Sequence, residues 1–107
     1  MNFSETIKEI VRLNSINVLQ NDSLFLAMFS DLAPDLKKER KIIKRICEES
    51  MMHAFFILVT CKDGDRETVI NAIVQELKNE IGLTEEWIQE IIDAFDLAFD
   101  LKVSSAL

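Results

Sequence analysis

The sequence predicts an all-α protein, a compact six-helix bundle, from three observations. Apolar residues recur every three or four positions in six segments, which is the spacing of one face of an α-helix. The 107 residues include two Gly, one Pro and no Tyr, which are low counts for a β-rich domain, whose turns need Gly and Pro. Hydrophobic residues make up 49% of the chain, enough for the packed core of a single domain. Short connections between the segments force successive helices to turn back on one another.

The first two helices are expected over residues 4–13 and 22–32. Ser4, and Asn21 or Asp22 ahead of the second helix, can accept hydrogen bonds from the free amide protons of a first helical turn. The second segment is apolar nearly all round. A helix of this kind lies in the centre of a core or exposes part of itself to a partner.

The third helix is expected over residues 35–49, because Pro34 ends the second helix and Asp35 can cap the next one. Its inward stripe consists of Leu36, Ile43, Ile46 and Cys47. The other positions hold half of the chain's twelve Lys and Arg residues, namely Lys37, Lys38, Arg40, Lys41, Lys44 and Arg45. The third helix should therefore present a basic face to solvent.

The fourth helix is expected over residues 50–62, with Ser50 as its N-cap, so that the chain turns sharply after the third helix. This segment is unusually rich in large apolar side chains. The side chains expected to face inward are Met52, Phe55, Phe56 and Val59, with Leu58 as a further candidate.

The fifth helix, over residues 65–81, carries the most regular apolar stripe in the chain. Gly82 follows at the position where a helix usually stops in the left-handed conformation. Thr84 can cap the sixth helix, and Leu83 before this cap can pack against Ile88 as a hydrophobic staple.

The sixth helix is strongly acidic. Between residues 76 and 100 the chain has eight acidic side chains and a single basic one, Lys78. The acids expected on the outward side are Glu86, Glu90, Asp93 and Asp100. Trp87 lies among them, one position off the apolar stripe, where it covers the edge of the core or serves as an exposed anchor for a partner.

One domain is expected over residues 1–103, followed by a frayed tail at residues 104–107. The N-terminus lacks the basic start and apolar run of a signal peptide, and the longest apolar stretch, residues 51–60, is too short to span a bilayer. We therefore expect a cytoplasmic protein, in which Cys47 and Cys61 are reduced.

No motif for catalysis, metal binding or cofactor binding is visible. The single His, His53, and the two Cys residues, Cys47 and Cys61, lack the Cys-x-x-Cys, His-x-x-x-His and Glu-x-x-His spacings of zinc sites. A nucleophilic pair of Cys47 and His53 would need an orienting third group and an oxyanion donor, for which a small bundle offers few loops. Residues 63–65, Asp-Gly-Asp, match a calcium loop over three positions only. The chain is thus expected to be no enzyme and to need no cofactor or metal.

Three interpretations of the basic helix are open: a solvated face, a docking face for an acidic protein surface, and a contact to nucleic-acid phosphates. The net charge of −7 at pH 7 disfavours nucleic acids and anionic membranes, because the long-range field repels polyanions. The patch also lacks the interleaved aromatic residues and Gly-rich loops of many nucleic-acid sites.

Two stretches of sequence resemble a known family. One comprises Asn-Asp-Ser-Leu at residues 21–24, Phe-Ser-Asp-Leu-Ala-Pro at 29–34 and Lys-Lys-Glu-Arg at 37–40; the other is Ile-Gly-Leu-Thr-Glu-Glu-Trp at 81–87, leading to two Ala-Phe pairs. Together they resemble the effector-associated or death-like helical domains at the ends of bacterial multidomain signalling and defence proteins. The resemblance covers about residues 19–101. It implies a death-fold-like bundle that serves as a non-enzymatic adaptor and brings an effector, such as a protease or a nucleotide-cleaving domain, to an assembly. The sequence departs from the family's pattern in showing no effector or second domain, so it is expected to be either an excised domain or a free-standing adaptor.

The expected function is therefore a protein–protein interaction domain that self-associates or recruits a related helical domain or an effector protein. The alternative is a small helical subunit of a nucleoprotein complex, which would contact phosphates with the basic helix. The residues expected to bind a partner are Lys37, Lys38, Lys41, Lys44, Arg45, Glu86, Trp87, Glu90, Asp93 and Asp100.

Overall fold

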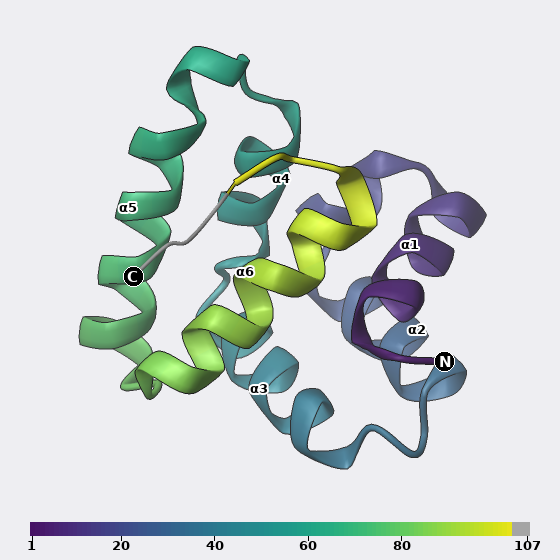
Figure 1. The fold of residues 1–107 in the computed structure, drawn as a ribbon. Helices are drawn as coiled ribbons and strands as arrows, with labels where there is room; N and C mark the ends of the chain where they lie inside the picture. Colours follow the sequence, from purple (N-terminus) through teal and green to yellow (C-terminus); the bar gives the residue numbers. More distant parts are fainter. Residues whose placement is uncertain (104–107) are drawn as a thin grey trace.

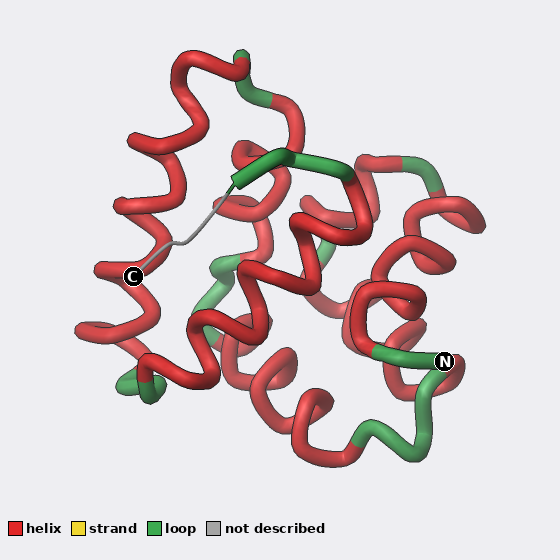
Figure 2. The backbone as a smooth tube through the Cα atoms, in the orientation of Figure 1, coloured by secondary structure: helices red, strands yellow, loops and turns green. Residues whose placement is uncertain are grey.

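The computed structural model describes residues 1–103, and this part of the chain forms helices and loops with no strand (Figure 1, Figure 2). Six α-helices follow the predicted segments: α1 (Phe3–Asn14), α2 (Asp22–Leu32), α3 (Lys37–Glu48), α4 (Met52–Thr60), α5 (Arg66–Glu76) and α6 (Glu85–Phe99). Three short turns join or extend them: the 3₁₀ turns η1 (Ile16–Gln20) and η2 (Asp63–Asp65), and the π-helical turn η3 (Leu77–Ile81). The prediction of a compact all-α bundle of six helices is confirmed.

The two charged helices, α3 and α6, lie in different parts of the bundle. In Figure 1, α6 runs diagonally across the front of the molecule, and α1 packs along it. The helix α3 lies at the lower edge of the same view and packs mainly on α2. The helix α4 packs on η1 and α5. Each charged helix therefore has its own inner neighbour and turns a separate outer face to solvent.

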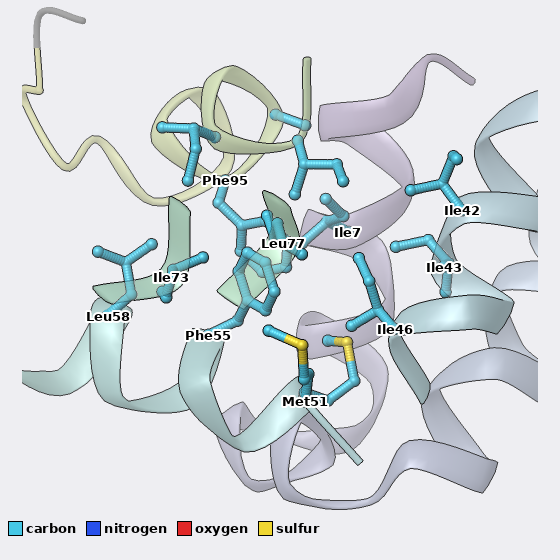
Figure 3. Close-up of a cluster of buried hydrophobic side chains, with 14 of the residues drawn as sticks. Ile7, Ile42, Ile43, Ile46, Met51, Phe55, Leu58, Ile73, Leu77 and Phe95 are labelled. Atoms are coloured by element: carbon cyan, nitrogen blue, oxygen red, sulfur yellow. The ribbon is translucent and has the colours of Figure 1, made fainter. Parts of the chain in front are cut away.

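One continuous hydrophobic core holds the six helices together. Figure 3 shows Phe55 of α4 and Phe95 of α6 turned toward each other in the middle of this core. Their rings stack with centroids 4.5 Å apart, and both side chains are fully buried. Replacing either ring by Ala would cost about 3–5 kcal/mol of stability, because the site leaves a large cavity.

Two of the predicted helix starts and the predicted left-handed stop are confirmed. The Asn21 side chain accepts a hydrogen bond from the Leu24 amide at 3.1 Å, and Thr84 Oγ1 accepts one from the Trp87 amide at 3.3 Å. Gly82 has φ = 74° and ends the fifth helical segment. At this backbone angle a side chain would be strained, so Gly is the residue that fits.

Three predicted N-caps are wrong. Ser4 lies inside α1, whose N-cap is Asn2 in a reciprocal pair with Glu5. Asp35 lies before α3, whose N-cap position is held by Leu36 with no side-chain hydrogen bond. Ser50 has φ = 57° and lies outside α4. The residue type alone does not place a cap, because the chain on both sides must also reach the right backbone angles.

The true cap of α4 comes from a different helix. The Met52 amide, in the first turn of α4, donates a hydrogen bond to Asp22 Oδ1 at 3.2 Å. Asp22 lies in the first turn of α2, so this contact joins the starts of two helices. A carboxylate is also favoured beside the positively polarised end of a helix. The contact could not be predicted from local sequence, since thirty residues separate the two groups.

The end of the predicted fifth helix differs from a regular α-helix. The α-helical hydrogen bonds stop at Glu76, and the chain continues as the π-helical turn η3. This wider turn keeps Leu77 and Ile81 buried together, and the Leu83 amide then donates to the Leu77 carbonyl at 3.0 Å. The extra residue per turn thus adjusts the apolar stripe to the core.

Most of the predicted inward stripes are buried, with exceptions at their edges. Phe56, Val59 and Leu36 are only half-buried, whereas Leu58 is fully buried. None of the helices within residues 1–103 is long and apolar enough to cross a membrane. Residues 104–107, which were expected to fray, lie outside the described residues.

Candidate functional site

The basic face of α3 is built by helical spacing. Lys37, Lys41 and Lys44 follow one another at four and three residues, which places them in a single row, here called the basic ridge. All three are exposed, as are Lys38 and Arg45 beside them. The opposite side of α3 is buried through Ile42, Ile43 and Ile46. Burial of this apolar side fixes the direction in which the lysines point.

The lysines of the basic ridge have no ionic partner among residues 1–103. The ion pairs in this part of the chain join Glu9 to Arg12, Asp63 to Arg66 and Glu85 to Lys78. None of them involves α3. The charge of the basic ridge is therefore not used in any described ion pair. These lysines do not stabilise the fold by pairing with acidic side chains of residues 1–103.

Arg45 differs from its neighbours on α3. Its guanidinium donates a hydrogen bond to the carbonyl oxygen of Ile81, at the end of η3. This contact supplies a donor to a carbonyl at a helix end, where backbone acceptors lack helical partners. Arg45 therefore joins α3 to the end of the fifth helical segment, although its side chain stays exposed. Among the predicted partner-binding residues of α3, Arg45 thus also contributes a contact within the fold.

The acidic face of α6 has the same kind of spacing. Glu86, Glu90 and Asp93 follow one another at four and three residues and are exposed; they are here called the acidic ridge. The opposite side of α6 is fully buried through Ile88, Ile91, Ile92 and Phe95. Asp93 accepts a hydrogen bond from the Gln89 side chain at 2.8 Å, within the same helix. The acidic ridge is thus a second surface row whose described residues make no ion pair.

Two other predicted residues of α6 lie at the margins of this ridge. Asp100 is exposed and follows the helix in the left-handed conformation, with φ = 51°. Trp87 is half-buried and packs against the hydrophobic core. Of the two interpretations of Trp87, covering the edge of the core accounts for this position better than an exposed anchor does.

The structure reveals an apolar residue in line with the acidic ridge. Leu97 comes four residues after Asp93 and is 74% exposed, the largest exposed fraction among the large apolar side chains of residues 1–103. The sequence pattern contains a signal for it, since positions 86, 90, 93 and 97 form one row at helical spacing. The pattern of charges alone does not identify Leu97.

A shallow hollow lies at the start of the basic ridge. It is lined by Ser30, Pro34, Lys37, Arg40 and Lys41. Arg40 is held in place there, because its Nε donates to Ser30 Oγ at 2.9 Å. Lys and Arg stems are apolar along their length and carry their charge at the tip. The hollow therefore combines apolar walls with a positively charged rim.

A larger hollow of about 630 Å³ lies between the start of α5 and residues 99–103. One of the charged groups that line it, the Arg66 guanidinium, is already surrounded by acceptors of this chain. It donates to the carbonyl oxygens of Leu58, Cys61 and Leu101 at 3.5, 3.3 and 3.4 Å, and to the Asp63 carboxylate at 2.8 Å. Sequence reasoning did not single out Arg66, because all three carbonyls are brought to it by the fold.

The residues considered for catalysis or metal binding do not form a joint site. Burial, with the negative charges of Asp22 and Glu48 added, raises the pKa of the Cys47 thiol to about 12, so this thiol stays protonated near neutral pH. His53 is exposed and stacks on Phe56 with ring centroids 6.0 Å apart. Within residues 1–103, no group of three or more His, Cys, Asp or Glu residues is arranged to hold a metal ion.

Comparison of the chain with protein-family models, curated proteins and solved structures finds no match. Function is therefore inferred from the two charged ridges and their surroundings.

Proposed function

We propose that this protein is a non-enzymatic interaction domain, an adaptor that binds a second copy of itself or a related helical domain through the basic ridge of α3 and the acidic ridge of α6. One observation supports this proposal above the others. Two exposed rows of opposite charge lie on separate helices of an acidic chain, and none of their described residues is used in an ion pair. A row of one sign is complementary to the other row on a neighbouring molecule.

The two ridges would contribute mainly to the rate and the specificity of binding. An exposed ion pair is worth only about 0–1 kcal/mol, because water and salt screen it. Complementary rows of charge nevertheless speed up encounter and fix the orientation of the partners. Affinity needs an apolar contact from which water is excluded, and the exposed Leu97 is suited to provide one.

We extend this proposal to the death-like type of bundle and to the recruitment of an effector, as the sequence resemblance implies. The motifs that carry the resemblance have local roles here: Asn21 and Thr84 are N-caps, and Gly82 ends a helix. The charged ridges therefore support the adaptor function more directly than the motifs do.

The test is a charge reversal with a matched control. The double variant Lys41→Glu/Lys44→Glu should lose association, because it turns the centre of the basic ridge acidic. Glu is a good helix former, so helicity should be kept. The control is Lys8→Glu/Lys62→Glu, which changes the net charge by the same amount at two exposed lysines outside α3 and α6. Sedimentation velocity and binding to the immobilised unmodified protein would compare the two variants.

A compensating reversal tests whether the two ridges meet. Adding Glu86→Lys/Glu90→Lys to the Lys41→Glu/Lys44→Glu variant should restore association, since coupling between distant mutations reports direct contact. Association of the unmodified protein should also weaken as salt rises to about 0.5 M, where the Debye length is below roughly 5 Å. If the reversed variant and its control associate equally well, the basic ridge is a solvated face and the proposal fails.

Nucleic-acid binding is a separate outcome of the same set of proteins. A phosphate-binding α3 would hold a labelled oligonucleotide at low salt and lose it with a steep salt dependence. The Glu86→Lys/Glu90→Lys variant would then bind the oligonucleotide more tightly, because it reduces the repulsion from α6. Under the adaptor function neither protein binds the oligonucleotide at low salt.

A further inference from the structure

Leu97 lies where a soluble helix normally has a polar residue. It belongs to the row that begins with the acidic ridge. Asp93 and Asp100 lie about one turn from it along the chain, and Glu90 lies about two turns before it. Single exposed apolar residues are common on protein surfaces. An apolar side chain flanked by carboxylates is a stronger indication of a binding site than a single apolar residue, because the arrangement resembles the centre and the charged rim of a small binding site.

The hollow on α3 has the complementary character. Its walls are Pro34 and the stems of Lys37, Arg40 and Lys41, and its rim carries their positive charges. Leu97 with its carboxylates and this hollow with its cations match in shape, since one protrudes and the other recedes. They also match in charge.

The two helix rows match in length when they run in opposite directions. From Glu86 to Asp93 the rise along α6 is about 10 Å, and from Lys44 back to Lys37, the first residue of α3, it is also about 10 Å. Leu97 lies about one turn beyond Asp93, and Pro34 lies three residues before Lys37, in the turn ahead of α3. In this alignment Glu86 faces Lys44, and Asp93 faces Lys37. Leu97 then reaches Pro34 and the hollow.

The parallel alignment is poorer. It places Glu86 opposite Lys37 and Asp93 opposite Lys44, but Leu97 then faces the carboxylate of Glu48, and the hollow stays empty. It also brings the like-charged ends of the two helices together. In the antiparallel alignment Glu48 lies beyond Glu86, toward the positively polarised start of α6.

We propose that copies of this chain associate head to tail, with α6 of one copy antiparallel to α3 of the next and Leu97 seated in the hollow lined by Ser30, Pro34, Lys37, Arg40 and Lys41. This inference rests on the proposed function and specifies the contact. Because the two surfaces differ, each copy keeps one free surface of each kind. Such a contact builds a ring or a filament and not a closed symmetric dimer.

A mixing experiment tests the head-to-tail arrangement. The Leu97→Ser variant keeps its basic ridge, and the Lys41→Glu/Lys44→Glu variant keeps its acidic ridge with Leu97. Each variant alone should sediment as a monomer, with self-association of the Leu97→Ser protein weakened ~10-fold or more. Mixed in equal amounts, the two should form a 1:1 complex through the one intact pair of surfaces. Circular dichroism checks that both variants are folded.

Disulfide cross-linking tests the direction of the helices. In a Cys61→Ser background, the Lys37→Cys/Asp93→Cys variant should link into covalent multimers on oxidation, because these positions face each other in the antiparallel alignment. The Lys44→Cys/Asp93→Cys variant should link only in the parallel alignment. Non-reducing gels compare the two, and preferential linking of the second variant would overturn the proposed direction.

The outcomes separate this inference from the proposed function. If Leu97→Ser associates as the unmodified protein does while Lys41→Glu/Lys44→Glu does not, the charged ridges bind but Leu97 does not, and the inference is wrong. A mixture that stays monomeric, or an unmodified protein that stays monomeric up to about 1 mM, also overturns it. In that last case, the proposed adaptor function would apply only to a related helical domain as the partner.

Discussion

Arg66 and the lysines of the basic ridge carry the same charge in opposite surroundings. The Arg66 side chain is 14% exposed and contacts three backbone carbonyls and one carboxylate. The lysines are exposed, and none of them is in a described ion pair. The difference separates a positive charge that holds the fold from positive charges without a described partner. Arg66 ties the end of α4 and the segment after α6 to the start of α5, whereas the ridge is the surface that we propose for another molecule.

Replacing Arg66 by Met should cost much more stability than any change on the charged ridges. Met keeps much of the volume but removes every donor, so the carbonyls of Leu58, Cys61 and Leu101 lose a charged partner. We expect a loss of about 2–4 kcal/mol in the free energy of unfolding. The melting temperature should fall by roughly 10 °C or more. Thermal circular dichroism measures this, and a fall of less than about 3 °C would show that the contacts contribute little.

The comparison between Arg66 and the ridges also shows what local sequence can predict. The ridges, the stripes of α5 and α6 and the stop at Gly82 follow from spacing within one segment, and they were predicted. The contacts of Arg66 come from residues 58, 61 and 101, which only the fold brings together. The Asp22 cap of α4 is of the same kind. No pattern within a single helix contains this information.

Three of the predicted caps failed for a related reason. Ser4, Asp35 and Ser50 all have side chains suited to capping, yet each lies one or two residues from the first residue of its helix. Asn2 accepts from an amide of α1 and the distant Asp22 from an amide of α4, whereas α3 begins without a side-chain cap. Leu97 was missed although its signal is local, because a pattern of charges drew attention to the acids in its row.

Replacing Asp22 by Ala should have an intermediate effect. The Met52 amide would lose its acceptor, and loss of an N-cap costs about 1–2 kcal/mol. The Asp22→Asn variant is the matched control, since its side-chain oxygen can still accept this hydrogen bond. Chemical denaturation should rank the Ala variant below Asn and Asn near the unmodified protein. Equal midpoints for all three would show that water replaces the cap without cost.

The buried thiol of Cys47 should make stability depend on alkaline pH. Its pKa is raised to about 12 in the folded protein by burial and by nearby negative charge, from an ordinary value of 9.0. The folded state therefore holds its proton more tightly, and the contribution is fully present below pH 9 and declines as pH rises toward 12. At pH 10 the loss should be about 1 kcal/mol relative to a Cys47→Ala variant. Parallel pH profiles for the two proteins would contradict this.

Neutralising the basic ridge should have the smallest effect on stability, and this result completes the contrast with Arg66. In the Lys41→Gln/Lys44→Gln variant the free energy of unfolding should stay within about 0.5 kcal/mol, because exposed lysines without ion pairs hold nothing in place. Association, in contrast, should weaken. Gln is a good helix former, so α3 itself is not at risk. A stability loss approaching that of Arg66→Met would mean that the ridge holds the fold, which would remove the reason for assigning it to a partner. If the Lys41→Gln/Lys44→Gln variant keeps its free energy of unfolding but loses association, the exposed lysines of α3 act in binding and not in folding.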